Sequence, residues 1–240
     1  MRLNVPTPAS ALAVGAHPDD VEFGAGGTLA RWAADGCLVH HLVLTDGSKG
    51  TWHLDADTAA LVARRQDEQR EAARRLGATG EVRFLARVDG ELEAGLTERT
   101  AVARAIRELR PAAVLGHDPW RRYRLHPDHR AAGFVVCDAV VMAREPHFAV
   151  DGLPAWRPVL LLLWEADEPD VLIDVSAHVE EKLDALLAHE SQFESTMAIA
   201  DASAEDEVTR FRRRVLDRLA IWGCQAGVAH AEAFKVLDSL

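Results

Sequence analysis

Short apolar segments of strand length alternate with longer amphipathic segments along most of this chain, and this alternation limits the accessible folds most strongly. Strands that alternate with helices build mostly parallel sheets covered by helices on both faces. The sequence therefore predicts an α/β three-layer sandwich. The expected strands are 11–16, 37–44, 82–85, 112–116, 159–164 and 171–173; the expected helices are 23–35, 58–76, 98–109, 128–143, 176–190 and 205–222.

The fold expected from this pattern is Rossmann-like, with one domain over residues 1–240, because no repeat or low-complexity segment interrupts it. The net charge of −11 argues against sequence-independent binding of nucleic acid, which needs a basic surface. The longest apolar run, 159–164, is far shorter than the roughly 18 residues of a membrane span, so we expect no stable membrane anchor.

The cysteines and the N-terminal segment indicate where in the cell the protein is expected. Three widely separated cysteines without a CxxC pair are typical of reduced, buried thiols in a cytoplasmic protein. The apolar segment 11–16 is too short for a signal peptide. The basic positions of 211–218 fit a solvated helix face, or alternatively a contact in a homo-oligomer.

Polar residues follow three of the expected strands, at 17–20, 45–49 and 117–129. In open α/β sheets, ligands bind beyond the carboxyl ends of the strands. We therefore expect the functional site to be built from these three segments.

The tripeptide His-Pro-Asp occurs in two of these segments, as AHPDD at 16–20 and HPDHR at 126–130. Adjacent carboxylates repel unless a cation or hydrogen bonds separate their roles, although Asp19 and Asp20 could also simply begin the next helix. Histidines three apart at a helix start share a face, but this spacing also arises by chance on surfaces. A His and an Asp from one loop with a His from the other would form a three-ligand metal site with an open position.

Such a site suits hydrolysis of an amide. A bound cation supplies Lewis acidity, and a carboxylate that does not bind it can take a proton from water and return it to the leaving amine. The remaining histidine, if protonated, can stabilise the oxyanion.

Together these segments resemble the LmbE-like (PIG-L) deacetylase family over nearly the whole chain. The matching motifs are AHPDDVEFGAGGTLA (16–30), LTDGSKG (44–50), RQDE with a later LG (65–68 and 76–77), HPDHRAAG (126–133), HESQ (189–192) and AEAF (231–234). The resemblance implies a metal-dependent hydrolase that removes an N-acetyl group from an amino-sugar glycoside or a related small metabolite.

The resemblance also implies roles for individual residues. His17, Asp20 and His129 would bind the metal, expected to be Zn²⁺, although Fe²⁺ or another divalent ion would suit the same ligands. Asp19 would be the general base and proton donor, and His126 would stabilise the oxyanion. The expected substrate-binding residues are Arg65, Asp46, Ser48, Asp118 and Arg124.

The segment 120–125, WRRYRL, departs from the family pattern because Tyr123 lies three residues, not two, before His126. Arg121, Arg122 and Arg124 raise the prospect of an anionic substrate, such as a phosphate, carboxylate or nucleotide; the alternative is a solvated loop that balances an acidic protein. We expect His117 either to reach the pocket or to be structural, and His41 and His189 to be structural.

Parts of the sequence are also compatible with other functions. An amidase of a larger thiol or sugar conjugate would use the same chemistry. A dinucleotide-binding module fits the fold, but the first loop lacks G-x-G-x-x-G and carries two carboxylates that would repel a pyrophosphate. A non-catalytic metal or sugar binder would not need the free carboxylate of Asp19, so Asp19→Ala would separate a binder from an enzyme.

Overall fold

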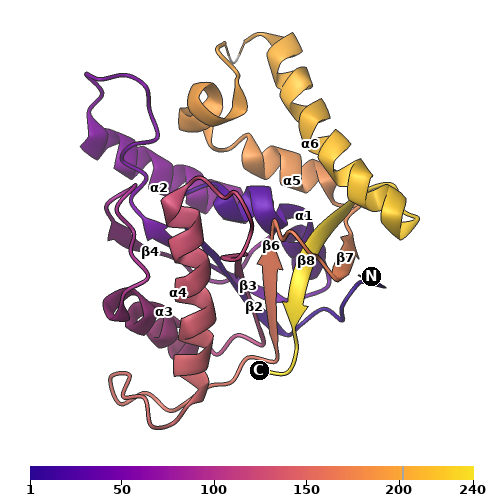
Figure 1. The fold of residues 1–240 in the computed structure, drawn as a ribbon. Helices are drawn as coiled ribbons and strands as arrows, with labels where there is room; N and C mark the ends of the chain where they lie inside the picture. The colour runs from indigo at the N-terminus through magenta and orange to yellow at the C-terminus, as the bar shows by residue number, and fades with distance from the viewer. Residues whose placement is uncertain (202) are drawn as a thin grey trace.

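The computed structural model describes residues 1–201 and 203–240, and within them eight strands form one sheet (Figure 1). Their order is β1-β7-β8-β6-β5-β2-β3-β4, and all neighbours pair in parallel except β8, which is antiparallel to β6 and β7. The strands are β1 (Arg2–Leu3), β2 (Ser10–Gly15), β3 (Leu38–Thr45), β4 (Val82–Arg87), β5 (Ala113–His117), β6 (Leu160–Trp164), β7 (Val171–Asp174) and β8 (Ala231–Leu237).

Helices cover both faces of the sheet, which gives three layers. Alternate residues of a strand point to opposite faces, so Ala11 and Ala13 of β2 pack in one core cluster while Leu12 and Val14 pack in the other. The first cluster includes residues of α1, α2, α5 and α6, and the second includes residues of α3 and α4. The helices are α1 (Asp20–Ala34), α2 (Thr58–Arg75), α3 (Leu96–Leu109), α4 (Pro127–Arg144), α5 (Val179–Leu186) and α6 (Glu205–Ala226).

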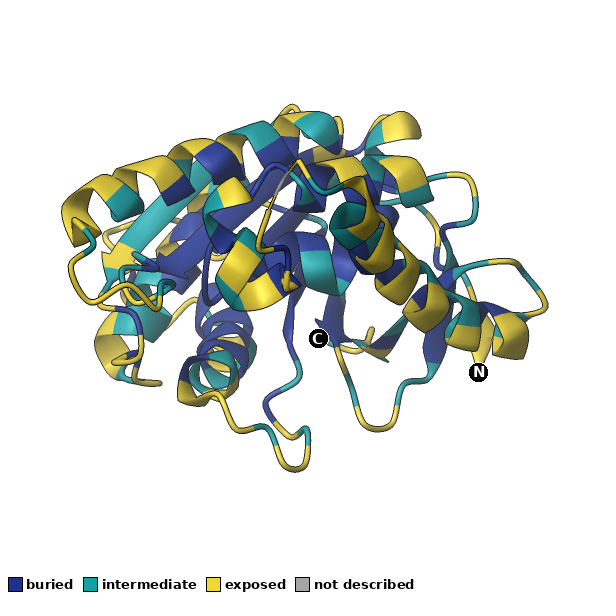
Figure 2. Cartoon of the chain, turned by 90° about the horizontal axis from the view of Figure 1, so that it is seen from above, coloured by how far each residue is buried: buried dark blue, intermediate teal, exposed yellow. Residues whose placement is uncertain are grey.

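Burial follows this layering. Figure 2 shows buried strands between helices whose outer faces are exposed. The predicted α/β three-layer fold with a mostly parallel sheet is confirmed, and most element ends lie within one or two residues of their predicted positions. In the described part of the chain, no helix is both long and apolar enough to cross a membrane.

Several parts of the prediction were wrong or incomplete. Strands β1 and β8 were not predicted, and β8 enters the sheet antiparallel between β7 and β6. The helix expected over 176–190 is shorter, because the Ser176 hydroxyl bonds to Asp174 instead of capping a helix, and α5 begins at Val179. A short 3₁₀ helix (Glu190–Gln192) and a π-helical turn (Phe193–Met197) follow it.

Helix α1 begins at Asp20, three residues before its predicted start, so Asp19 is its N-cap residue and Asp20 lies in its first turn. Helix α6 continues four residues beyond its predicted end, to Ala226, where Gly227 closes it in the left-handed region. The earlier start of α1 places both acidic residues of the AHPDD motif at the N-terminus of a helix.

The topology fixes where a site can form. From β2 the chain proceeds outward through β3 to β4, then returns to β5 on the other side of β2. Such a reversal opens a crevice between the carboxyl ends of the two strands. The loop with His17 follows β2, and the loop with His126 follows β5, so the crevice brings the two His-Pro-Asp segments together.

Candidate metal and catalytic site

A cavity of about 590 Å³ opens at the carboxyl edge of the sheet, over β2 and β5. Its walls come from the loops after β2, β3, β4, β5 and β6, together with residues of α1, α2, α4 and α6 and the short helical turns after α5. The five residues for which metal or catalytic roles were expected all line it: His17, Asp19, Asp20, His126 and His129.

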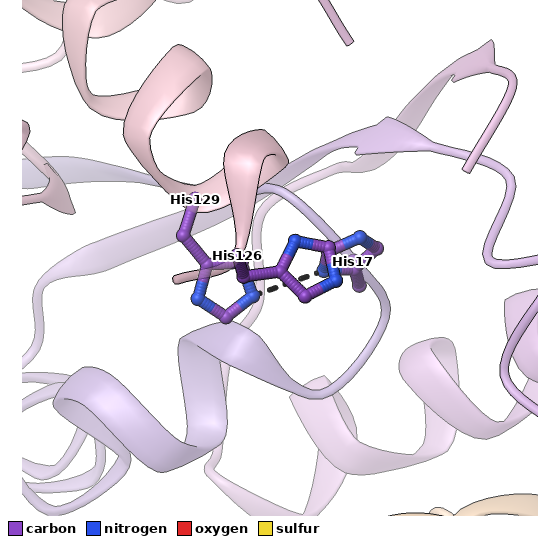
Figure 3. Close-up of side chains that lie close together, drawn as sticks. All are labelled: His17, His126 and His129. Atoms are coloured by element: carbon purple, nitrogen blue, oxygen red, sulfur yellow. Dashed lines mark hydrogen bonds between the residues drawn. The ribbon is translucent and has the colours of Figure 1, made fainter. Parts of the chain in front are cut away.

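His17, Asp20 and His129 meet pairwise inside this cavity, and Figure 3 shows His17 and His129 facing each other. His17 Nδ1 lies 3.1 Å from His129 Nε2 and 3.3 Å from Asp20 Oδ2, and His129 Nε2 lies 3.2 Å from Asp20 Oδ1. Ligand atoms about 2.0–2.1 Å from a tetrahedral Zn²⁺ are about 3.4 Å apart. Asp20 turns a different carboxylate oxygen toward each ring, so two imidazole nitrogens and one carboxylate lie at a spacing that suits one small divalent cation.

The charge states of these groups also suit a cation. Burial lowers the pKa of His129 to about 3, so its imidazole is neutral, as a metal ligand must be. Burial opposes ionisation of Asp20, but hydrogen bonds with His117 and His17 lower its pKa well below the usual range. Burial likewise opposes protonation of His17, but contacts with Asp128, Asp20 and a third carboxylate raise its pKa well above the usual value. Without a metal, a proton on His17 therefore carries the positive charge that these carboxylates favour.

Two further carboxylates, not singled out from the sequence, hold the other side of the His17 ring. His17 Nε2 lies 3.1 Å from Asp128 Oδ2 and 3.2 Å from Asp89 Oδ1. Asp128 also accepts hydrogen bonds from the backbone N–H groups of Gly90 and Leu92. Carboxylates in this position fix the ring and direct its other nitrogen toward a metal. Asp128 lay within the HPDHR motif, whereas Asp89 follows β4 in a segment with no recognisable motif.

Asp19 faces the cavity from a strained backbone conformation, with φ 111° and ψ −26°. Such a conformation costs roughly 1–3 kcal/mol for a residue other than glycine. The carboxylate is buried and lies 3.6 Å from the guanidinium of Arg65. Burial raises the pKa of Asp19 to about 6; Arg65 opposes this rise, and Asp20 adds to it. A carboxylate with this pKa is ionised at neutral pH and basic enough to take up a proton.

His126 is the N-cap residue of α4 and lies at the mouth of the cluster. Its ring stacks on His129 with centroids 4.7 Å apart and meets His17 edge-on at 4.7 Å. Its nitrogens are also close enough to those of His17 and His129 for these three to form an alternative metal-binding group. Burial and the neighbouring His17 lower the pKa of His126, so its neutral ring offers one N–H to an acceptor in the cavity.

His117 ends β5 behind the cluster. The indole N–H of Trp164 donates to His117 Nδ1 at 3.0 Å, so Nε2 of the neutral ring carries the proton. That nitrogen lies 3.3 Å from Asp20 Oδ2, which gives Asp20 a neighbouring donor. Asp20, His117 and His129 also lie close enough together to form a possible ligand group. Because Nδ1 of His117 accepts from Trp164, its Nε2 keeps the proton, and this ring orients Asp20 instead of binding a metal.

Of the five expected substrate-binding residues, Arg65 alone is among the residues that line the cavity. Arg65 lines the cavity but is almost fully buried, and its guanidinium donates to the carbonyl oxygens of Pro18 and Gly47. Asp46 accepts from the N–H groups of Ser48 and Asp89, and neither Asp46 nor Ser48 is among the cavity-lining residues.

The second loop instead reaches the cavity through Lys49 and Gly50. Its glycines are required by Arg65, because a Cβ at Gly47 or Gly50 would lie within 2.7 or 2.1 Å of the guanidinium. The LTDGSKG segment is therefore shaped around Arg65, with Lys49 exposed and paired with Glu91 at 2.9 Å.

Asp118 accepts the backbone N–H of Trp120 and does not line the cavity. Arg124 contacts His129 Nδ1 and pairs with Glu165, whose carboxylate does face the cavity. Burial opposes ionisation of Glu165, but His117 and Arg124 lower its pKa to about 2.

The other basic residues of this loop also have acidic partners. Arg121 lies 3.3 Å from Glu165, and Arg122 lies 2.9 Å from Asp167. Tyr123 is 94% exposed and does not line the cavity. Because the arginines are already paired, the arrangement favours the interpretation that they balance local acidic groups over recognition of an anionic substrate.

Several known proteins are similar to this chain in sequence and architecture. The model of the PIG-L family, described as GlcNAc-PI de-N-acetylase, matches residues 12–140. A diacetylchitobiose deacetylase of Thermococcus kodakarensis is 37% identical over 186 residues, which cover 76% of this chain and 69% of that protein. A 1D-myo-inositol 2-acetamido-2-deoxy-alpha-D-glucopyranoside deacetylase of Rhodococcus opacus is 36% identical, over 67% of this chain and 62% of its own length.

The structural similarity extends over almost all of the chain. The N,N'-diacetylchitobiose deacetylase of Pyrococcus horikoshii superimposes with a TM-score of 0.86 and 28% identity, over 96% of this chain and 84% of that one. The matched residues include both His-Pro-Asp segments and the sheet edge that brings them together. The chain therefore belongs to the PIG-L family of N-acetylglucosaminyl deacetylases.

Proposed function

We propose that this protein hydrolyses the N-acetyl group of an N-acetylglucosamine glycoside, with a divalent cation, expected to be Zn²⁺, held by His17, Asp20 and His129. The observation that carries the proposal is the mutual approach of these three donors within 3.3 Å, beside a free carboxylate. Two imidazoles and one carboxylate suit Zn²⁺ and also Fe²⁺, so metal analysis of the purified protein distinguishes them. A bound cation would supply Lewis acidity to the water and the acetyl carbonyl.

The residues of this chain would then carry the protons. Asp19 removes a proton from the attacking water as the new C–O bond forms. The negative charge that develops on the former carbonyl oxygen accepts a hydrogen bond from His126. Asp19 returns the proton to the amine nitrogen as the C–N bond breaks, which releases acetate and a free amino sugar. Asp128 and Asp89 keep the His17 ring in place during these steps.

Substrates named for the relatives guide the choice of test compounds. N-acetylglucosamine is joined to inositol, L-malate or a second sugar in those proteins' substrates. The paired state of Arg121, Arg122 and Arg124 supports an uncharged glycoside over an anionic one. We further propose a cytoplasmic location and a single domain over residues 1–240, and the one continuous sheet supports the single domain.

Acetate release from a panel of N-acetylglucosaminides tests this function. The panel contains N,N'-diacetylchitobiose, the inositol and L-malate glycosides and a simple aryl glycoside, each tested with the chelated protein before and after Zn²⁺ is added back. We expect zinc-restored release with at least one compound, and faster release with the uncharged glycosides than with the malate glycoside. No release from any of them by protein that contains one bound metal would reject an N-acetylglucosaminide as substrate and direct attention to larger amide conjugates.

A further inference from the structure

A cluster of polar side chains is buried directly behind Asp19. Glu22, His41, Gln69 and His189 are all fully buried, and none lines the cavity. Buried polar groups lower stability unless each finds a hydrogen-bonding partner, so such a cluster calls for a physical reason. Its contacts show one, because the cluster ends on the backbone of Asp19.

Two side chains of helix α2 hydrogen-bond to one peptide unit of the catalytic loop, one to its carbonyl oxygen and one to its N–H. Arg65 donates from Nη2 to the Pro18 carbonyl oxygen at 2.7 Å, and Gln69 Oε1 accepts the Asp19 N–H at 3.0 Å. The two groups belong to the same peptide bond, and in a trans peptide they point in opposite directions. Arg65 and Gln69 are one helical turn apart on the same face of α2, so they can reach both sides of it.

The rest of the cluster fixes the orientation of the Gln69 amide. Because the Asp19 N–H can only donate, the oxygen of Gln69 faces it and the nitrogen faces away. That nitrogen donates to Glu22 Oε1 at 2.7 Å and lies 3.2 Å from His41 Nδ1. The second oxygen of Glu22 lies 3.3 Å from His189 Nε2. A flipped Gln69 amide would place donor against donor at Asp19 and acceptor against acceptor at Glu22.

This peptide unit directly precedes Asp19, the residue with the strained backbone conformation. Asp19 has φ 111°, so relaxation toward an ordinary helical or extended conformation would turn its carboxylate away from the cavity. We propose that Gln69, oriented by Glu22, is a positioning residue that holds the peptide before Asp19 and thereby aims the Asp19 carboxylate at the reacting water. This inference rests on the proposed function, in which Asp19 is the base. It assigns roles to two residues that touch neither the cavity nor the cation ligands' side chains.

Gln69→Leu removes the hydrogen bond while keeping the bulk of the side chain. We expect kcat to fall about 100-fold, the effect of misplacing a catalytic group by about 1 Å, with KM changed less than about twofold and one bound metal retained. In the metal-free protein, the Asp19 amide should exchange its hydrogen at least about tenfold faster than in the unmodified chain. Gln66→Leu, the same substitution at a half-buried position of α2 whose side chain makes no hydrogen bond to the described residues of the catalytic loop, is the control and should change neither quantity.

Exchanging the amide of Gln69 and the carboxylate of Glu22 between the two positions should restore activity. Gln69→Glu alone places two buried carboxylates against each other and should abolish most activity. Adding Glu22→Gln restores one carboxylate and one amide: Glu at 69 accepts from the Asp19 N–H, and Gln at 22 donates to it and accepts from His189. We expect the double variant to recover kcat to within about fivefold of the unmodified enzyme, since the coupling belongs to the pair.

The outcomes separate the two claims. An unmodified enzyme that releases no acetate refutes the proposed function. In that case the exchange rate of the Asp19 amide still tests whether Gln69 holds the peptide before Asp19. An active enzyme in which Gln69→Leu keeps kcat and amide protection overturns the inference. If Gln69→Leu does not fold, a folded, metal-loaded double variant that is no more active than Gln69→Glu overturns it equally.

Discussion

Replacing Asp19 with Asn isolates the proton transfers from metal binding. Asn is nearly isosteric, and like Asp it tolerates the left-handed backbone region, so the strained loop should persist. With a pKa of about 6, Asp19 is about 99% ionised at pH 8, and essentially all of the unmodified enzyme contains the base. General acid–base groups contribute about 10²- to 10⁴-fold, and this one serves in two steps. We expect kcat to fall about 1000-fold, or about 4 kcal/mol in the activation barrier.

The assay is acetate release at pH 8 with saturating Zn²⁺, accompanied by measurement of bound metal. Asp217→Asn, a substitution on the exposed face of α6, is the matched control and should leave kcat unchanged. A decrease of less than tenfold in a folded Asp19→Asn protein that holds one metal would refute the role of Asp19 as base. Loss of the metal itself would show instead that Asp19 is a ligand.

Three further results are expected from the structure. The rate should be half its maximum near pH 6, become constant above about pH 7 and fall at lower pH, because the working form of Asp19 is the carboxylate; a profile without an acidic limb between pH 4 and 7 would contradict this assignment. Lys182→Met should lower the free energy of unfolding by about 3–5 kcal/mol in urea titrations, because it leaves Glu232 buried without its partner at 2.7 Å. Gly27→Ala should cost about 1–3 kcal/mol in the same assay, since the new Cβ would lie 2.8 Å from Val175 Cβ; unchanged stability would mean that α1 can shift.

The sequence was most informative where chemistry and topology coincide. His17, Asp20 and His129 could be proposed as ligands because both His-Pro-Asp segments directly follow strands, and parallel strands bring their carboxyl ends to one edge, where the three side chains approach one another. Residues that contribute through burial could not be found this way. Gln69 looks like any polar residue of a charged helix, and Asp89 lies in a loop without a motif, so only their positions in the fold show their contacts.

Long-range pairing explains the remaining differences. The sequence could not show that Arg121, Arg122 and Arg124 are paired, because their partners Glu165 and Asp167 lie about 40 residues away in sequence. Strand β8 was missed because AEAFKVL has only a weak alternating pattern, and its place between β7 and β6 depends on pairing that no local pattern specifies. Local periodicity predicted the layers of the fold, whereas partners distant in sequence required the structure.

Titration of the chelated protein with Zn²⁺ tests most directly whether the cluster of His17, Asp20 and His129 is the catalytic metal site. Acetate release from N,N'-diacetylchitobiose, or from whichever glycoside of the panel is hydrolysed fastest, should rise linearly to one equivalent of zinc. His129→Ala removes one of the three donors. With one equivalent of zinc, this variant should neither bind the metal tightly nor release acetate. Full activity of the metal-free protein, or an active His129→Ala variant with one tightly bound zinc, would contradict the assignment of this site.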